Sequence, residues 1–393
     1  MFCRLALEHG QRQCDESGIH LKYVSCFSGI GGLEADAPPE LFCEIDPDMQ
    51  KVLRGTHPEV PIWSDITTLK PPQADVLAGG WPCQDLSIAG KQAGLSGLRS
   101  GLLLDMLRVA KRARVHTVVA ENVANLLRMN GGQEFKYSLK NIHASGFPYI
   151  AWRMLNARSF GLPQHRMRLL IVASKSLEIA TSLFRPLPIL SEKSTRSGVE
   201  KLAAGFYWTG GTHSINYSEG YVPTIKIGSS LGIASPPAVM FDGVVRQLSP
   251  DEALALQGFS LDPSLFASKT AIYRAAGNAV ARPIGKWVMD GVQDPSLENP
   301  PFEWLPVQES LMPEFATQEW LKSGLSNRGK VRFAKFAQAS GATNLIDFLD
   351  TTNRNLLSPR ASSGLISRAE RSGQHVPNEL RQLLEEIAAT RPA

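Results

Sequence analysis

The sequence is short of cysteine and has no long hydrophobic run. Its 393 residues include five cysteines, an odd number, and no pair is spaced C-x-x-C. This argues against a disulfide framework or a zinc site and favours a reducing compartment, which we take to be the cytoplasm. No apolar run is long enough to cross a bilayer, and residues 1–20 carry charges throughout. Neither a membrane partner nor a secretory signal is therefore expected.

A strong excess of charge and internal repeats are also missing. The formal net charge is +4, with 20% charged and 43% hydrophobic residues, which is typical of a globular protein. This balance is compatible with nucleic-acid binding but does not predict it. The length exceeds that of one ordinary core, so two or three domains are expected.

Apolar segments alternate with helical patterns over the first 175 residues. The β-branched and aromatic runs lie at 21–27, 41–46, 62–66, 74–80 and 115–123, with a helical apolar stripe at 100–113. Two further strands are expected at 149–157 and 168–174, and helical patterns return at 244–293. Strands that alternate with helices predict an α/β fold with a largely parallel sheet covered on both faces.

The stretch "AGGWPCQDLSIAG" at 78–90 places Cys83 directly after a proline. The preceding run, 74–80, is predicted to be a buried strand that ends in glycines, and Pro82 keeps the chain extended. The thiol is thereby predicted at the carboxyl end of a strand, where open α/β sheets bind ligands. From this window alone, a functional thiol and a structural one are equally well supported.

Two acidic residues follow other predicted strands. The glycine turn "FSGIGG", 27–32, would let a cofactor approach the backbone, although it lacks the full G-x-G-x-x-G of dinucleotide sites. Glu44 ends the next strand, where such folds place an acid against ribose hydroxyls, and Asp65 ends the third. Taken singly, each acid is equally consistent with a solvated strand end.

The motifs become specific as an ordered series. They are "FSGIGGLE" (27–34), "EID" (44–46), "DIT" (65–67), "GGWPCQDLSIAGKQAG" (79–94), "ENV" (121–123), "NARSFGLPQHRMRLLIVA" (156–173), "RQLSPDEALALQGF" (246–259) and "GNAV" (277–280). Over roughly residues 21–293 the chain resembles the C5-cytosine DNA methyltransferase family. The resemblance implies a class I S-adenosylmethionine-dependent methyltransferase fold, Rossmann-like with a mostly parallel sheet, and a small target-recognition domain.

The domain boundaries follow from the resemblance and from composition. We expect an N-terminal extension, a catalytic domain in two parts, a target-recognition domain between them, and a C-terminal helical extension that opens with the proline-rich linker 294–306. The boundaries are 1–20, 21–175 and 246–293, 176–245, and 294–393.

The resemblance also implies the reaction. A methyl group would pass from S-adenosylmethionine, leaving S-adenosylhomocysteine, to C5 of a flipped cytosine in a specific duplex DNA sequence. Cys83 as thiolate would add to C6, and Glu121 would relieve the charge near N3 and N4. Arg166 and Arg168, at i and i+2 of a strand, are expected to face the same site, with Arg168 contacting the base and Arg166 supporting it.

Other site residues are carried over from the family in the same way. The expected cofactor contacts are Phe27, Gly29, Ile30, Glu44, Ile45, Asp65, Ile66, Pro82, Leu102 and Asn278. The glycine-rich run from Gln84 to Gly101 resembles a lid that closes over DNA, with Gln84, Ser87, Lys91 and Arg99 as its DNA contacts. The expected partner is double-stranded DNA, and the enzyme either accompanies a restriction endonuclease that acts on the same site or works as a solitary methylase.

Two features depart from the family. Pro38 and Pro39 truncate the helix expected after the glycine turn. The tail beyond 295 lies outside the family core; from Lys322 to Arg371 it has nine basic and three acidic residues. It is expected to be a small helical domain that packs on the catalytic core, and either contacts DNA phosphates or presents a solvated charged face.

Three other functions are considered. One is a C5 methyltransferase that acts on RNA, although the roughly 70-residue segment 176–245 and "RQLSPDEALALQGF" fit DNA better. Another is a DNA-binding regulator that has lost catalysis, against which Cys83, Glu121, Arg166, Arg168 and Asn278 argue. A dinucleotide-dependent oxidoreductase is disfavoured because the glycine spacing is wrong.

Overall fold

The computed structural model describes most of the two predicted domains and parts of the tail. The described residues are 14–15, 18–19, 21–34, 37–82, 101–190, 203–207, 215–226, 236–295, 302–304, 323–327, 330–336, 344–373 and 376–390. Cys83, Gln84, Ser87, Lys91 and Arg99 lie outside these residues. Among the described helices, none is long and apolar enough to span a membrane.

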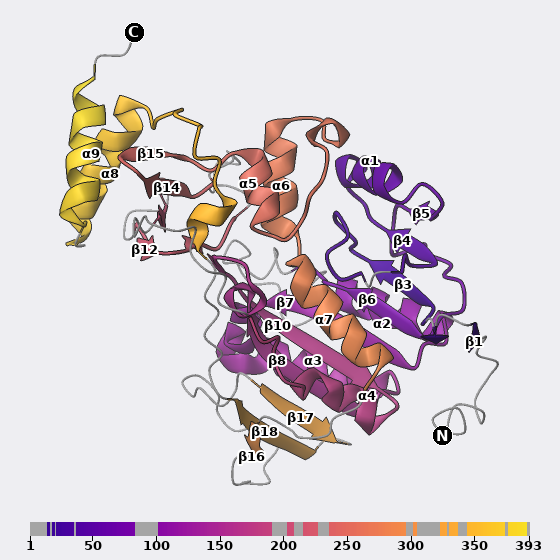
Figure 1. Cartoon of the computed structure of the whole chain (residues 1–393). Coiled ribbons are helices and arrows are strands. Elements are labelled where there is room, and N and C mark those ends of the chain that lie inside the picture. The colour runs from indigo at the N-terminus through magenta and orange to yellow at the C-terminus, as the bar shows by residue number, and fades with distance from the viewer. Residues whose placement is uncertain are drawn as a thin grey trace.

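A ten-stranded sheet lies at the centre of the larger lobe (Figure 1). Its order is β16 (Phe302–Trp304), β18 (Lys330–Phe336), β17 (Ser323–Asn327), β8 (Tyr149–Asn156), β10 (Met167–Ser174), β7 (Thr117–Val123), β6 (Val76–Gly79), β3 (Tyr23–Cys26), β4 (Leu41–Cys43) and β5 (Ile62–Trp63). The five strands from β7 to β5 are parallel, and the other five pair antiparallel with their neighbours. A short hairpin, β1 (Cys14–Asp15) with β2 (Gly18–Ile19), lies apart.

Both faces of this sheet are buried, as its continuous apolar strands predict. Along β6, Leu77 packs on the side of α2 (Gly101–Arg112) and α3 (Gln133–Ala144). Val76 and Ala78 point to the opposite side, toward α7 (Arg282–Gln293) and α4 (Leu177–Thr181). The α/β fold with helices on both faces is therefore confirmed.

Helix boundaries follow local sequence signals. In α1 (Pro47–Thr56), the N-cap Asp46 accepts from the Asp48 amide at 2.9 Å, and proline occupies the first position. The predicted serine cap at 249 is confirmed, because Ser249 and Glu252 form a capping box at the start of α5 (Pro250–Ala255). The described residues between β3 and β4 contain no helix, as Pro38 and Pro39 predict.

A smaller antiparallel sheet forms the second lobe. Its order is β12 (Ser218–Glu219), β11 (Ala204–Phe206), β14 (Ala238–Phe241) and β15 (Val244–Gln247). One face packs against α5 and α6 (Lys269–Asn278), and the other against α8 (Pro359–Ser372) and α9 (Asn378–Ala389). A parallel pair, β9 (Gln164–His165) with β13 (Val222–Pro223), joins the two lobes.

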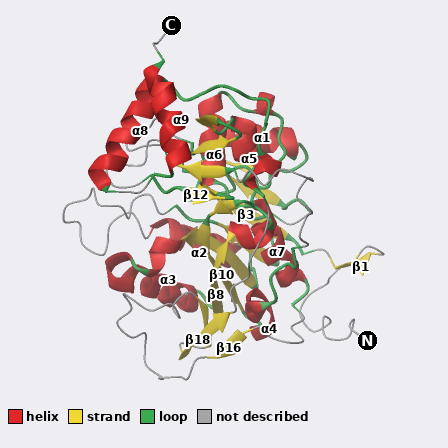
Figure 2. Ribbon diagram, turned by 60° about the vertical axis from the view of Figure 1, so that its left-hand side comes forward, coloured by secondary structure: helices red, strands yellow, loops and turns green. Residues whose placement is uncertain are grey.

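The tail differs from the expectation of a helical domain on the catalytic core. The predicted helix at the end of the chain is α9, but α8 and α9 pack on the small sheet through Leu365, Leu380 and Leu384. Figure 2 shows both helices beside β12, away from β16 and β18. The tail also contains strands β16, β17 and β18, and β17 pairs with β8 and extends the larger sheet. The alternation of basic and apolar residues in "KVRFAKF" is typical of a strand, and the net charge of the tail does not reveal it.

Candidate active site

A cavity of about 750 Å³ opens at the carboxyl ends of β3, β4, β6 and β7. This is the edge where parallel sheets place ligands. Nine of the ten expected cofactor contacts line it: Phe27, Gly29, Glu44, Ile45, Asp65, Ile66, Pro82, Leu102 and Asn278. Ile30 was wrongly expected there; its side chain is buried beneath the turn with Met49 and Val52, because the turn directs it into the core.

The glycine turn after β3 needs its glycines for two reasons. Gly29 (φ 56°) and Gly31 (φ 86°) adopt left-handed conformations, and Phe27 does so at φ 55° without being glycine. A Cβ added to Gly32 would lie 2.3 Å from the backbone oxygen of Val280. Glycine at 32 therefore lets the returning segment, which carries Asn278, approach β3 and complete the cavity.

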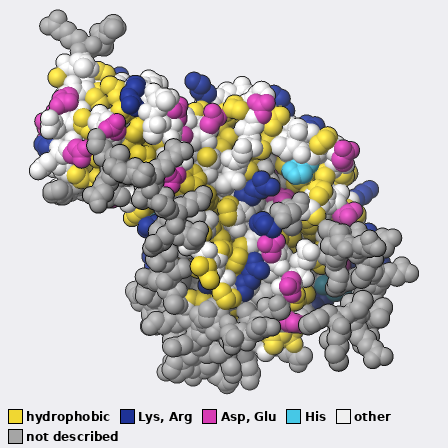
Figure 3. All heavy atoms as spheres, viewed as in Figure 1, with side chains coloured by type: hydrophobic (Ala, Val, Ile, Leu, Met, Phe, Trp, Pro, Cys, Tyr) yellow, Lys and Arg dark blue, Asp and Glu magenta, His cyan; other side chains and the backbone are white. Residues whose placement is uncertain are grey.

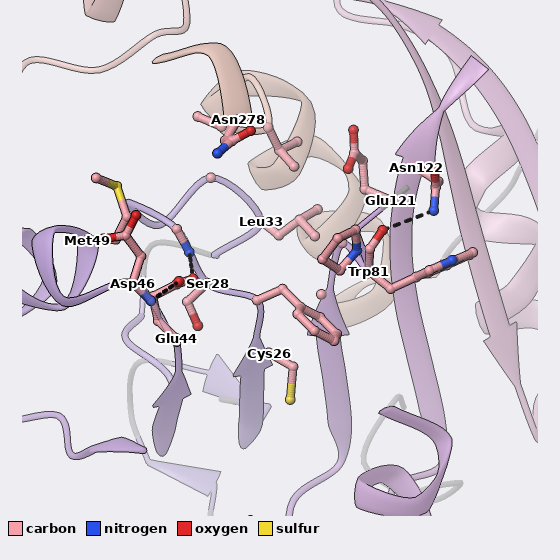
Figure 4. A pocket seen from close by; sticks show the side chains of 18 of the residues that line it. Cys26, Ser28, Leu33, Glu44, Asp46, Met49, Trp81, Glu121, Asn122 and Asn278 are labelled. Atoms are coloured by element: carbon pink, nitrogen blue, oxygen red, sulfur yellow. Dashed lines mark hydrogen bonds between the residues drawn. The ribbon is translucent and has the colours of Figure 1, made fainter. Parts of the chain in front are cut away.

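Glu44 is held by backbone amides at the cavity wall. Its Oε2 accepts from the Gly29 amide at 2.7 Å, and its Oε1 accepts from the Asp46 amide at 2.8 Å (Figure 4). Burial raises the pKa of this carboxyl, and these amide hydrogen bonds oppose the rise. The fixed carboxylate retains lone pairs that can accept from a pair of hydroxyl groups.

Apolar and acidic groups share the outer wall. Ile45 is 75% exposed and lines the cavity together with Phe27 and Ile66. An exposed aliphatic side chain beside an aromatic one suits a flat ring. The Asp65 carboxyl accepts from the Thr67 amide at 2.8 Å, and this bond holds the pKa of Asp65 below its usual range.

Glu121 and Arg168 form an ion pair at the inner end of the cavity. Arg168 Nε lies 2.8 Å from Glu121 Oε1, and both side chains are 12% exposed. Burial raises the pKa of Glu121, while Arg168 and then Arg166 oppose the rise. A Cβ at Gly80 would lie 2.8 Å from Glu121 Oε2, so the glycine in "GGWPC" leaves room for the carboxyl. Pro82, the residue before Cys83, lines the same cavity.

Comparison with known proteins identifies the chain. The family model described as C-5 cytosine-specific DNA methylase matches residues 21–198. The type II methyltransferase M2.BsuMI of Bacillus subtilis (strain 168) is 33% identical over 376 residues, covering 89% of this chain and 94% of that protein. The type II methyltransferase M.Bsp6I of Bacillus sp. (strain RFL6) is 27% identical over 69% of this chain and 98% of its own length.

The chain belongs to the C-5 cytosine-specific DNA methylase family. It is a DNA (cytosine-5-)-methyltransferase with type II restriction–modification homologues. Membership implies that S-adenosylmethionine is the methyl donor and DNA the substrate. Among solved structures, S. pombe Dnmt2 covers 70% of this chain and 99% of its own, at 16% identity and a TM-score of 0.49.

Arg166 of the methyltransferase does not face the site as expected. It precedes β10 rather than lying within it, so the two-residue alternation of a strand does not apply. Its guanidinium is fully buried and donates to the carbonyls of Ile225 (3.1 Å), Gly277 (3.0 Å) and Ala279 (2.7 Å). Arg166 thus ties the small lobe and the returning segment to the larger sheet, and lies beside the site without lining it.

Several cavity residues were missed from the sequence. Thr224, Ile225 and Lys226 reach the cavity from the small lobe, and the Lys226 ammonium lies 4.6 Å from the centre of the Tyr207 ring. The sequence carries no signal for them, because they reach the cavity through the fold, where the Thr224 hydroxyl donates at 2.6 Å to the carbonyl of His165, next to Arg166. Glu34, in the motif "FSGIGGLE", also lines the cavity and was not singled out.

Proposed function

We propose that the methyltransferase methylates C5 of a cytosine flipped out of a specific duplex DNA sequence, through a covalent bond between Cys83 and C6. The observation that carries this proposal is the position of the Glu121–Arg168 pair. It lies in the same cavity as the pinned Glu44 carboxylate and as Pro82, the neighbour of Cys83. A carboxyl with a raised pKa, a cofactor wall and the residue before the predicted nucleophile thus converge from separate strands.

The cavity residues fit S-adenosylmethionine, which when bound supplies an electrophilic methyl group on a sulfonium sulfur. Glu44 would accept from the two ribose hydroxyls with its remaining lone pairs. Phe27, Ile45 and Ile66 would pack on adenine, and Asp65 would accept from its amino group. Nothing in the structure lies within 4 Å of a Cβ built on Gly29, which leaves the turn open to a ligand.

The chemistry then follows from the chain's own residues. The Cys83 thiolate adds to C6 of cytosine, and the negative charge that develops on the ring is relieved at N3. Burial raises the pKa of Glu121, which supports a carboxyl that holds a proton and delivers it to N3. Arg168 fixes that carboxyl and can donate to O2 of the base. C5 then takes the methyl group, its proton leaves to a base, and the thiolate departs to restore the 5,6 double bond.

The small lobe is proposed to read the DNA sequence. Lys226 and Thr224 come from this lobe and line the cavity that would receive the base. No carboxylate lies within 4 Å of the Lys226 ammonium among the described residues, which leaves it available to a phosphate. The likeness to type II methyltransferases supports a place in a restriction–modification system, with an endonuclease that recognises the same site.

The proposal is tested by expressing the protein in cells free of DNA methylation and mapping 5-methylcytosine by conversion sequencing. We expect methylation at one short duplex sequence. With duplex DNA that contains 5-fluorocytosine at that site, the wild-type enzyme should form a stable adduct, because fluorine cannot leave as a proton. Cys83→Ser should bind the same DNA and form no adduct, since an alcohol is far less nucleophilic than a thiolate. An adduct with Cys83→Ser would contradict the mechanism.

A further inference from the structure

Glu34 is a buried carboxyl group that the mechanism above leaves unused. Its side chain belongs to a residue that is 7% exposed and lies beneath Gly31, where an added Cβ would be 3.5 Å from Glu34 Oε2. Among the described residues this oxygen has no hydrogen-bond partner, while Oε1 lies 2.6 Å from the Ser25 hydroxyl. A carboxylate with an unpaired buried oxygen is costly, whereas a neutral acid in the same place is much less so.

The serines next to Glu34 decide which form fits. The Ser25 hydroxyl contacts both Glu34 Oε1 (2.6 Å) and Ser28 Oγ (2.8 Å), but a hydroxyl has one proton. If Glu34 is ionised, Ser25 must donate to it and cannot donate to Ser28. If Glu34 is protonated, it donates to Ser25, Ser25 donates to Ser28, and Ser28 is free to donate to the carbonyls of Ser25 (3.1 Å) and Cys43 (3.3 Å). With Glu34 ionised, the one Ser28 proton goes either to Ser25 Oγ or to the carbonyls, so at least one contact has no donor. With Glu34 protonated, every contact has a donor, and the two carbonyls share the Ser28 proton.

This chain of hydrogen bonds ends at the cofactor cavity. Ser28 lines the cavity, and its amide and hydroxyl both contact the carbonyl of Cys43 on β4. The amide of the neighbouring Gly29 donates the hydrogen bond that holds Glu44 Oε2. Figure 4 shows Ser28 and Glu44 side by side on this wall. The direction of the Ser28 hydroxyl therefore bears on the position of the turn that holds Glu44.

The charged groups around Glu34 are few. Arg282, the first residue of α7, acts on it through space and favours the charged form, but burial outweighs it and raises the pKa of Glu34 to about 7. Cys43, Glu44 and Asp46 line the same cavity, and at the end of α1 burial and then the charge of Arg282 lower the pKa of His57. At Glu34, burial outweighs the combined effect of the Ser25 hydroxyl, the backbone amides of Glu34 and Leu33, and Arg282.

We propose that Glu34 acts as a neutral carboxylic acid and is a positioning residue for the cofactor: it donates a hydrogen bond through Ser25 to Ser28 and holds the glycine turn in its binding geometry. The inference rests on the proposed cofactor site. It predicts that loss of the proton weakens cofactor binding, so affinity falls in alkaline solution while the thiolate form of Cys83 increases. The Michaelis constant for the cofactor, rather than kcat, should carry the alkaline loss.

The test measures the dissociation constant of S-adenosylhomocysteine by calorimetry from pH 6 to 8.5. For the wild-type chain it should rise above pH 7, by up to about tenfold per pH unit. Glu34→Gln keeps a donor at this position and should bind with little change across the range. Glu34→Ala removes the donor and should bind weakly at every pH. Glu59→Gln, at an exposed acid on the loop after α1, is the matched control and should follow the wild-type profile.

The outcomes separate the two proposals. A wild-type chain that does not bind the nucleoside at any pH contradicts the cofactor site itself. Wild-type binding that does not change with pH, or a Glu34→Gln profile that matches the wild type, overturns the role of Glu34 alone. If Glu34→Ala does not fold, as judged by circular dichroism, the comparison of wild type with Glu34→Gln still decides.

Discussion

Three carboxyl groups in one cavity differ in the partners that surround them. Glu44 accepts from two backbone amides, Glu121 pairs with Arg168, and Glu34 contacts the Ser25 hydroxyl and the backbone amides of Leu33 and Glu34. Burial raises the pKa of all three, and the available donors decide how far each rise goes. At the residue scale, a glutamate side chain can therefore bind hydroxyl groups, hold a proton for the cytosine or donate a structural hydrogen bond, depending on its partners.

Removing the acid at 121 should separate chemistry from cofactor binding. Glu121→Gln cannot hold a transferable proton at N3, so the single-turnover methylation rate should fall by about 10²- to 10⁴-fold. Glu44 does not contact Glu121, so the dissociation constant of S-adenosylhomocysteine should change little. A variant with an undiminished methylation rate would show that Glu121 supplies no proton.

Filling the space at Gly32 should disturb the returning segment. Gly32→Ala places a Cβ 2.3 Å from the Val280 oxygen, and both groups are backbone, so the segment that carries Asn278 must move. We expect a loss of stability of about 1–3 kcal/mol and weaker cofactor binding, measured by denaturation and calorimetry. Gly101→Ala is the control: no described residue lies within 4 Å of the added Cβ, and Gly101 begins a helix, so the stability of this variant should be equal or greater.

Glu34 should also make folding stability depend on pH. Its pKa is raised from 4.5 to about 7, so the folded state keeps a proton that the unfolded chain loses. Stability from this group is fully present below pH 4.5 and falls as pH rises to about 7, by about 3 kcal/mol in total. Glu34→Gln should lack this decline in denaturant titrations between pH 5 and 8. Equal slopes for the variant and the wild type would contradict the raised pKa.

At the element scale, the strands and helices of the larger lobe could be predicted where the pattern was long. The strands at 117–123 and 167–174 each contain a continuous apolar stretch, 118–120 and 169–173, and helix α2 has a clear apolar stripe. Three features could not be predicted, because each depends on partners distant in sequence. The Arg166 guanidinium donates to the carbonyls of Ile225 and Gly277 and so points away from the cavity. The Ile30 side chain is buried in the core instead of lining the cavity. Strand β17 forms by pairing with the edge of β8.

Site residues that follow a strand could be predicted from the sequence. Glu44 and Asp65 line the same cavity because parallel strands end at one edge of the sheet. Lys226 was not predictable, since it reaches the cavity from another lobe through the β9–β13 pair. Composition alone assigns the segment 176–245 to a small domain, but gives no register for its strands.

The specificity for a DNA sequence should be transferable only if the grafted segment keeps the buried contacts between the small sheet and helices α8 and α9. We expect that replacing 176–245 by the segment of another family member changes the methylated sequence, mapped by conversion sequencing. In this chain the small sheet also packs against α8 and α9, so the graft must keep Phe206, Ala238, Met240 and Val245, which are buried in that contact. A graft that keeps them and still methylates the original site would contradict the role of this lobe.

At the scale of the whole molecule, the tail joins the two lobes. It adds β17 and β18 to the larger sheet, passes Leu345 and Leu349 over the core beneath the small sheet, and ends in α8 and α9. The basic residues of the tail were expected either to contact DNA phosphates or to form a solvated face, and the strand register places one of them. Lys330 pairs with Asn327 of β17, which pairs with Tyr149 of β8. Tyr149 in turn pairs with Ser174 of β10, and Ser174 with Thr117 of β7. Lys330 therefore lies at the end of the sheet opposite Glu121.

Charge reversal on β18 should therefore leave DNA binding unchanged. β18 is four strands from β7, roughly 19 Å across the sheet. The described part of the face in Figure 3 carries both acidic and basic side chains, in keeping with the small formal net charge of +4. Replacing Lys330 and Arg332 of β18 by glutamate should preserve DNA affinity and its salt slope. A weaker affinity with a flatter slope would restore the phosphate-contact hypothesis.

The tail is attached to the small lobe by hydrogen bonds between Asp350 and the Arg246–Glu252 pair. Arg246 is fully buried and pairs with both carboxylate oxygens of Glu252, at 2.8 and 2.6 Å. Glu252 also accepts from the Asp350 amide at 2.6 Å, and Arg246 donates to the Asp350 carbonyl at 2.9 Å. One ion pair thus holds β15, α5 and the tail together.

Glu252→Ala should leave the Arg246 charge buried without a partner and release the tail at Asp350. Breaking a buried pair in this way costs about 3–5 kcal/mol, which denaturant unfolding can measure. Protease cleavage after Arg354 should also become faster, because the tail is no longer fastened next to it. Glu370→Ala is the matched control: its ion pair with Arg381 at 3.4 Å is exposed, so the cost should stay below about 1 kcal/mol. Equal losses in the two variants would mean that the buried pair does not fasten the tail.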